Sequence, residues 1–168
     1  LALACLEARF DTAAWRLLTD LNEQLDYPEG LIPHTLLAIR RASLEDDAID
    51  TAREYVEKQS DSPMAWLGLA TVAQLEEEPE LQREALEKAT EVDPNSYEAW
   101  YQLAVLLDKQ KEYRTARDVY RRLLDLRPDD AAVMNNLAYT LLQLDGPVED
   151  ALNLAERAHE AFGQNPHV

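Results

Sequence analysis

The sequence is poor in the residues that most often build catalytic, redox or metal sites. Its 168 residues include one cysteine, four glycines and three histidines. A single cysteine, Cys5, excludes an intramolecular disulfide framework and a zinc site with several thiolates. The glycines stand singly at positions 30, 68, 146 and 163, so the chain has no glycine-rich phosphate loop. No apolar run approaches the roughly 18–20 residues of a membrane-spanning helix.

Basic residues are also scarce. The chain has 16 Lys and Arg against 33 Asp and Glu, which gives a formal net charge of −17. A field of that sign repels phosphate backbones and anionic lipid, so nucleic acid and membrane surfaces are poor partners. The charge favours solubility and basic partners.

The polar residues form no constellation that carries chemistry. His34, His159 and His167 have no second ligand at helical metal spacing, and Cys5 is most simply a small core residue. We therefore predict no catalytic residues, no cofactor and no metal. The chain begins without Met, inside an apolar stretch, and we expect it to be a fragment. Its compartment, cytoplasmic or bacterial periplasmic, is left open.

What the sequence does contain is helix-forming residues in a repeating pattern. Ala, Leu and Glu dominate, and 46% of residues are hydrophobic. Apolar residues recur every 34 positions, as do two prolines. The matching sets are Trp66, Trp100 and Met134; Leu69, Leu103 and Leu137; Ala70, Ala104 and Ala138; and Pro94 with Pro128. Such a period indicates stacked helical hairpins, each too small to bury its own apolar face.

The clearest unit carries the skeleton of a known repeat. It reads Trp100-x2-Leu103-Ala104-x2-Leu107, then Ala116-x3-Tyr120, then Pro128. This pattern resembles the tetratricopeptide repeat (TPR) family. The resemblance implies an all-α, right-handed α-solenoid of stacked antiparallel helix hairpins. In style the chain resembles bacterial multi-repeat scaffold proteins. Trp66 and Trp100 are expected to pack in the core.

The same 34-residue period divides the chain into units. The predicted divisions are a partial unit at 1–28, full units at 29–62, 63–96, 97–130 and 131–165, and the start of a further unit at 166–168. The 131–165 unit contains a one-residue insertion in the turn at 144–147. Its second helix therefore carries its alanines, Ala151, Ala155 and Ala158, one position late.

In the TPR family, the first helices of successive units line a concave groove that holds a partner segment. Carried over by register, the groove would present His34, Leu37, Arg41, Leu67, Thr71, Gln74, Tyr101, Gln102, Val105, Asn135, Asn136, Tyr139 and Gln143. Leu67, Tyr101, Val105 and Tyr139 are expected to be exposed, which would mark a contact surface. The alternative is that Tyr101 and Tyr139 brace adjacent helices. Apolar residues occupy places that the family's carboxylate clamp fills with bases or amides, so that clamp is not predicted.

These observations predict a non-catalytic scaffold or adaptor whose partner is a protein or peptide. Two alternatives stay open: a recruitment or regulatory arm of a larger enzyme, and a self-assembly module that associates end to end through uncapped repeats. Charge is uneven as well. Residues 99–130 hold seven bases, which either form a docking patch for an acidic partner or pair with acids of the preceding unit, such as Glu84 and Glu87.

Overall fold

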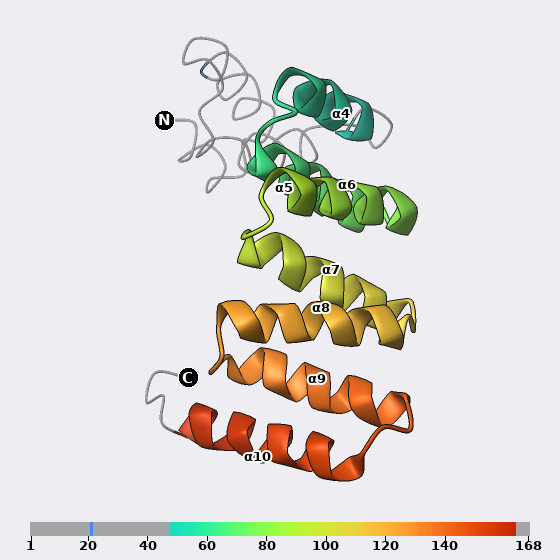
Figure 1. Ribbon diagram of the computed structural model, residues 1–168. Coiled ribbons are helices and arrows are strands. Elements are labelled where there is room, and N and C mark those ends of the chain that lie inside the picture. Colours follow the sequence, from blue (N-terminus) through green and yellow to red (C-terminus); the bar gives the residue numbers. More distant parts are fainter. Residues whose placement is uncertain (1–20, 22–47, 164–168) are drawn as a thin grey trace. The chain divides into compact units, whose positions relative to one another are not determined.

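The computed structural model describes residue 21 and residues 48–163, and within those ranges it contains helices and no strand. The chain divides into two compact units, one ending at Ser96 and one beginning at Tyr97. In each unit, consecutive helices are antiparallel and joined by short turns (Figure 1). The described residues therefore agree with the all-α prediction.

Three helices make up the described part of the first unit. Their bounds are α4, Ala48–Lys58; α5, Pro63–Leu75; and α6, Pro79–Val92. Two begin at a proline, whose missing N–H would have no intrahelical partner at that position. Helix α5 packs against both α4 and α6.

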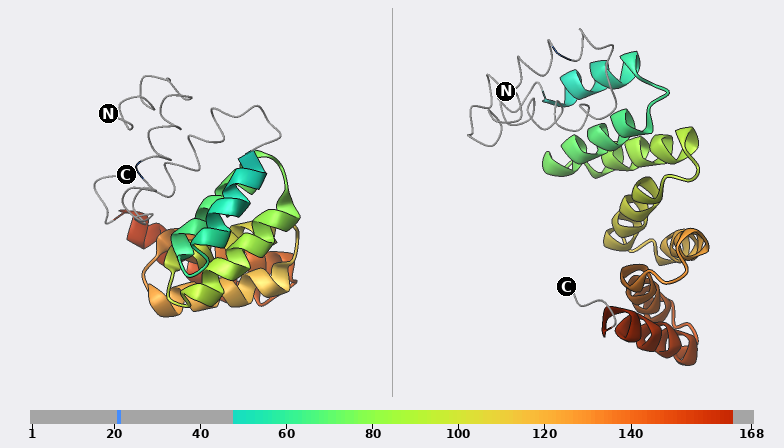
Figure 2. Two further views of the ribbon diagram at one scale, coloured as in Figure 1. Left: turned by 90° about the horizontal axis from the view of Figure 1, so that it is seen from above. Right: turned by 90° about the vertical axis from the view of Figure 1, so that its left-hand side faces the viewer.

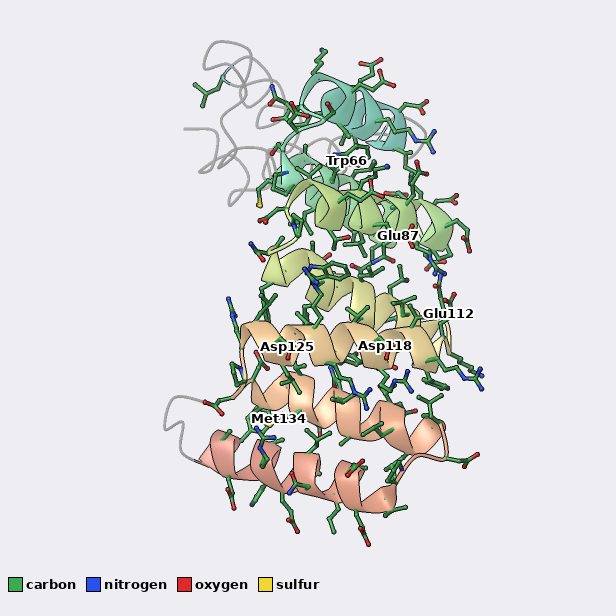
Figure 3. All side chains as sticks on the ribbon, viewed as in Figure 1. Trp66, Glu87, Glu112, Asp118, Asp125 and Met134 are labelled. Atoms are coloured by element: carbon green, nitrogen blue, oxygen red, sulfur yellow. The ribbon has the colours of Figure 1, made fainter. Side chains whose placement is uncertain are left out.

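Four helices make up the described part of the second unit. Their bounds are α7, Tyr97–Lys109; α8, Tyr113–Leu126; α9, Ala131–Gln143; and α10, Val148–Gly163. Each packs against the next along the chain, and the views in Figure 2 agree with this order. The carboxylate of Asp130 caps α9 by accepting a hydrogen bond from the Val133 N–H at 3.0 Å. Met134 of α9 lies on the side near Arg157 and Ala161 of α10 and is 1% exposed (Figure 3).

One turn geometry recurs inside the hairpins α5–α6, α7–α8 and α9–α10. Each turn has one residue with a positive φ, and these residues are spaced by 34: Glu77 (60°), Lys111 (62°) and Asp145 (51°). The next N–H donates to the carbonyl five residues earlier: Glu78 to Ala73 at 2.8 Å, and Glu112 to Leu107 and Gly146 to Leu141 at 2.9 Å. This is the helix C-terminal motif in which glycine is the usual left-handed residue.

Lys111 adopts the left-handed backbone conformation, which is unfavourable for a residue with a side chain. Lys111→Gly should therefore increase the stability of the chain. A non-glycine residue in the left-handed region costs about 1–2 kcal/mol, and the extra unfolded-state entropy of glycine cancels part of the relief. We expect the free energy of unfolding to rise by about 0.5 kcal/mol in urea titrations. The control is Arg121→Gly in the exposed interior of α8, which should lower it by about 1 kcal/mol. A Lys111→Gly variant no more stable than the parent would contradict this account of the turn.

The core contains most of the residues that the repeat pattern predicts. Ala70 and Ala104 are fully buried and Ala138 is 5% exposed, which lets the helices of each pair approach closely. The second helices contribute Leu86, Ala116, Tyr120 and Ala151, each at most 3% exposed.

Three predicted core residues are less buried than expected. Trp66 and Trp100 are both half-buried. The Trp66 indole N–H donates to the Ser60 carbonyl at 2.8 Å, and the Arg122 guanidinium carbon lies 4.7 Å from the centre of the Trp100 ring. Ala155 is exposed because it lies on a side of α10 that α9 does not cover. The two tryptophans are alike in burial, as the 34-residue period predicts, but differ in their polar contacts.

Candidate functional site

The structure places the predicted groove residues in three groups. His34, Leu37 and Arg41 lie outside the described residues. Thr71 and Gln74 are exposed on α5, and the Thr71 hydroxyl donates to the Leu67 carbonyl at 2.9 Å. The remaining predicted residues belong to α7 and α9.

The predicted exposure of Leu67 is wrong, because its side chain is only 6% exposed. Helix α5 is apolar nearly all round, and seven of its thirteen residues are buried. A helix with neighbours on two sides buries positions that would be outward-facing on a helix packed on one side. Leu67 is therefore a packing residue of the first unit.

On α7 the predicted residues are partly exposed and partly engaged. Tyr101, Gln102 and Val105 are all half-buried. The Tyr101 ring is stacked on that of Tyr97, with centroids 6.2 Å apart and planes 13° apart. The Gln102 side-chain amide donates to the Glu98 carboxylate at 2.7 Å. Tyr101 thus braces its own helix while it presents part of its ring to solvent.

On α9 the predicted residues surround a hollow. Tyr139 is 53% exposed, Asn135 and Gln143 are exposed, and Asn136 is half-buried. Asn135, Asn136 and Tyr139 line a cavity of about 470 Å³ between α9 and α10. The structure brings these three side chains together at one place in the second unit.

The other half of this hollow was missed from the sequence. Its further lining includes Leu142 on α9 and Val148, Leu152 and Ala155 on α10. A signal was available, because Val148, Leu152 and Ala155 follow the i, i+4, i+7 spacing of a second apolar stripe on α10. The stripe Ala151, Leu154 and Ala158 already accounts for packing, so a second stripe indicates a second contact surface.

A polar cluster joins three helices of the second unit. The Tyr120 hydroxyl on α8 donates to Asp108 Oδ2 on α7 at 2.9 Å. The Thr140 hydroxyl on α9 lies 3.0 Å from Asp108 Oδ1 and 2.8 Å from the Asn136 carbonyl, and it shares its proton between them. Tyr120 is 1% exposed and Thr140 is fully buried. Burial, and then the bond to the Asp108 carboxylate, raise the pKa of the Tyr120 phenol well above its ordinary value.

A second polar contact ties α7 to the start of α9. The Tyr97 hydroxyl donates to Asp130 Oδ2 at 2.5 Å, while Asp130 Oδ1 caps α9. Burial and this bond raise the pKa of Tyr97 above its usual value. The Arg127 guanidinium carbon lies 3.8 Å from the centre of the Tyr97 ring. Helices α7 and α9 are the first helices of their hairpins. Hydrogen bonds between buried or half-buried side chains therefore join them near both ends.

Charged side chains also form contacts within single helices. On α6, Arg83 pairs with Glu87 at 3.0 Å and Lys88 with Glu91 at 2.7 Å. Exposed pairs of this kind contribute little to stability. In the second unit, Arg122 and Arg127 lie over aromatic rings. Part of the basic cluster in residues 99–130 is thus engaged in packing within its own unit.

The described part of the chain offers no metal-binding group of three or more His, Cys, Asp or Glu side chains. Nor does any described helix have the length and apolarity to cross a bilayer. The surface of α9 and α10 combines exposed apolar groups with amides that can both donate and accept hydrogen bonds. Such a surface suits a polypeptide ligand.

Comparison with known proteins identifies the repeats. Two family models, both described as tetratricopeptide repeat, match residues 85–118 and 107–166. Superkiller protein 3 of Saccharomyces cerevisiae is 26% identical over 105 residues, which are 62% of this chain. The match spans 7% of the length of the yeast protein.

Solved structures show the same fold at low sequence identity. A crystal structure of MamA is 15% identical, with 98% of this chain and 89% of that one covered and a TM-score of 0.76. A MamA fragment from Desulfovibrio magneticus gives 15% identity, 98% and 93% coverage and a TM-score of 0.75. YrrB, described as a TPR protein with an unusual peptide-binding site, gives 17% identity, 98% and 84% coverage and a TM-score of 0.71.

These likenesses confirm the fold predicted from the sequence, an all-α solenoid of helix hairpins. The matched repeats cover the residues from which the resemblance was first drawn, Trp100 to Pro128. Residues 85–166 of the chain consist of tetratricopeptide repeats.

Proposed function

We propose that this chain is a non-catalytic protein-interaction module that binds a segment of a partner protein on the outer side of its first helices. In the second unit that surface consists of Tyr101, Gln102 and Val105 on α7, and of Asn135, Asn136, Tyr139 and Gln143 on α9. Thr71 and Gln74 on α5 of the first unit, and His34, Leu37 and Arg41, belong to the same predicted set.

The observation that carries the proposal is the exposure of Tyr139 beside Asn135 and Asn136. The Tyr139 hydroxyl interacts with that of Tyr113 on α8, yet the ring is 53% exposed on a helix that buries most of its large apolar side chains. Tyrosine is also a residue that often dominates binding energy, because it buries much area with few rotatable bonds. The two neighbouring amides can bond to a peptide backbone.

Rigid support strengthens this interpretation. Asp108 and Asp130 hold α7 and α9 together through Thr140 and Tyr97. A surface that does not rearrange on binding loses less entropy when the partner docks. The likeness to YrrB, whose description includes peptide binding, points to the same class of ligand.

Tyr139→Ala tests the proposal. Peptides selected from a displayed random library on the parent chain should bind the variant at least about tenfold more weakly, because an exposed aromatic anchor is lost. The free energy of unfolding should change by less than about 1 kcal/mol, since the ring is largely exposed. Binding is measured by fluorescence anisotropy and stability by urea titration.

The matched control is Leu126→Ala on α8, which removes another partly exposed apolar side chain, 37% exposed, from a second helix. Its affinity for the same peptides should equal that of the parent. Equal losses of peptide affinity in both variants, or no loss in Tyr139→Ala, would contradict binding at the proposed surface.

A further inference from the structure

A cavity of about 450 Å³ borders the start of α9 and the last turns of α10. Its lining consists of Asp129, Met134, Arg157, Glu160 and Ala161. Met134, labelled in Figure 3, stands 34 residues after Trp100, so the cavity lies where the preceding hairpin has an indole ring. A methionine side chain is narrower than an indole ring and leaves part of that place unfilled.

The side of the cavity that α10 forms retains a cation and has lost an apolar side chain. Helices α8 and α10 begin 35 residues apart, so Arg157 corresponds to Arg122. In the preceding hairpin the Arg122 guanidinium carbon lies 4.7 Å from the centre of the Trp100 ring, which is a cation–π contact. Ala161 corresponds to the larger Leu126. The α9–α10 hairpin thus keeps the arginine of this contact without the ring.

The cavity also keeps an acceptor for an indole N–H. In the first unit the Trp66 indole donates to the carbonyl of Ser60, six residues earlier, at 2.8 Å. The carbonyl six residues before Met134 belongs to Pro128, and the Arg157 guanidinium donates to it at 3.4 Å. This hydrogen bond is long. An arginine therefore lies at the acceptor that an indole uses in the corresponding place of the first unit.

A following repeat would leave this cavity open. Arg157 comes nine positions after Val148, which lines the hollow on α9 and α10, and this turns it about 180° around α10 from that hollow. The preceding hairpin shows the same arrangement with its neighbour in place. Helix α9 packs on α8, yet Leu126 is 37% exposed and Trp100 is only half-buried.

The rim of the cavity is acidic. Asp129 and Glu160 line it and are both exposed. In the preceding hairpin Asn95 takes the position of Asp129, so the site in the α9–α10 hairpin has one more acid than its counterpart. A ligand with a basic side chain next to its aromatic ring would match both the cavity and the rim.

We propose that this cavity binds a tryptophan side chain of a partner protein, with the indole N–H donating to the Pro128 carbonyl and the Arg157 guanidinium over the ring. A lysine or arginine next to that tryptophan would face the acidic rim. The Met134 thioether makes favourable contacts with aromatic rings, and tryptophan often dominates binding energy at interfaces. Met134 lies about 140° around α9 from Tyr139, so the inference does not rest on the surface proposed above.

The two methionines of the chain, Met64 and Met134, provide a direct test. The full chain is labelled with carbon-13 at the methionine methyl groups and titrated with N-acetyl-tryptophanamide. The Met134 methyl resonance should move upfield and saturate, because an aromatic ring shields a methyl group that lies over its face. Met64 on α5 is the internal control and should not move. N-acetyl-leucinamide at the same concentration should move neither resonance.

A second ligand and two variants locate the contact. The 1-methyl derivative of N-acetyl-tryptophanamide lacks the indole N–H and should bind about three- to tenfold more weakly, the effect of one lost hydrogen bond. Ala161→Leu, which restores the side chain found at Leu126, should abolish the shift of the Met134 resonance by filling the cavity. Asn153→Leu, at an exposed position of α10 outside the cavity, should leave the shift unchanged. Thermal melts of both variants should match that of the parent.

Three results would overturn the proposal: no movement of the Met134 resonance, equal movement of both methionine resonances, or an unchanged shift in Ala161→Leu. Movement of the Met134 resonance when the concentration of the chain alone is raised would identify a second copy, and not a partner protein, as the source of the tryptophan.

Peptides selected from a displayed random library on the parent chain separate this site from the proposed function. Those that bind in the cavity should contain tryptophan beside lysine or arginine, and they should lose at least about tenfold in affinity in Ala161→Leu but not in Tyr139→Ala. Selected peptides that lose affinity only in Tyr139→Ala would keep the proposed function and reject a partner's tryptophan at this cavity.

Discussion

Leu123→Ala is expected to lower the free energy of unfolding by about 2–5 kcal/mol. Leu123 is fully buried on α8, where its neighbours in the core include the helices on either side. Truncation to alanine loses the transfer free energy of three carbons and leaves a cavity that a well-packed interior fills only partly. Urea titrations followed by far-UV circular dichroism would measure the change as a shift in the midpoint.

Leu126→Ala provides the matched comparison within the same helix. Leu126 is 37% exposed, so the same truncation removes less buried area, and we expect a loss below about 1.5 kcal/mol. Trp100→Ala should fall between the two, since the half-buried ring keeps one contact with Arg122. Similar losses for Leu123→Ala and Leu126→Ala would mean that α8 is not packed as the structure shows.

The period of the sequence predicted the helices because both depend on local chemistry. Spacing of Leu and Ala at three and four residues places them on one helix face, and recurrence at 34 places those faces at equal intervals. Ala104, Leu107, Ala116 and Tyr120 accordingly lie in the core. The turns follow the same period, since Glu77, Lys111 and Asp145 all adopt the left-handed conformation.

Exposure was predicted less well because it depends on neighbours that the period does not specify. Leu67 is buried since α5 has helices on two sides, whereas Ala155 is exposed since α9 covers only the other side of α10. The repeat register predicts the exposure of both residues from their positions in the repeat alone. A second apolar stripe on α10 was readable as i, i+4, i+7 spacing, but only the comparison with α8 shows that Tyr120 is replaced there by alanine.

The polar cluster at Asp108 could not be predicted from the repeat pattern either. Asp108 and Thr140 are 32 residues apart, which differs from the 34-residue period, and they are not residues of the same type. By register alone, Asp108 falls on the outer side of its helix with Tyr101 and Val105, where an acid is ordinarily solvated. Its partners come from two other helices, and this meeting depends on how α8 and α9 pack against α7.

Asp108→Ala should therefore destabilise the chain by about 2–3 kcal/mol. The substitution removes the carboxylate that accepts the Tyr120 hydroxyl proton, and Tyr120 is too buried to replace it with bulk water. Leaving a buried donor unpaired costs about 1–3 kcal/mol, at the upper end when the lost partner is charged. Thr140 is less affected, because its hydroxyl retains the Asn136 carbonyl at 2.8 Å.

A double-mutant cycle with Tyr120→Phe separates this bond from any general effect of removing the acid. If the hydroxyl and the carboxylate bond to each other, the double variant should be about 1–2 kcal/mol more stable than the sum of the two single losses predicts. Asp108→Asn, which keeps an acceptor oxygen, should cost less than Asp108→Ala. Additive losses in the cycle would show that the Tyr120 hydroxyl and the Asp108 carboxylate do not bond to each other, and Asp108 would then tie α7 to α9 through Thr140 only.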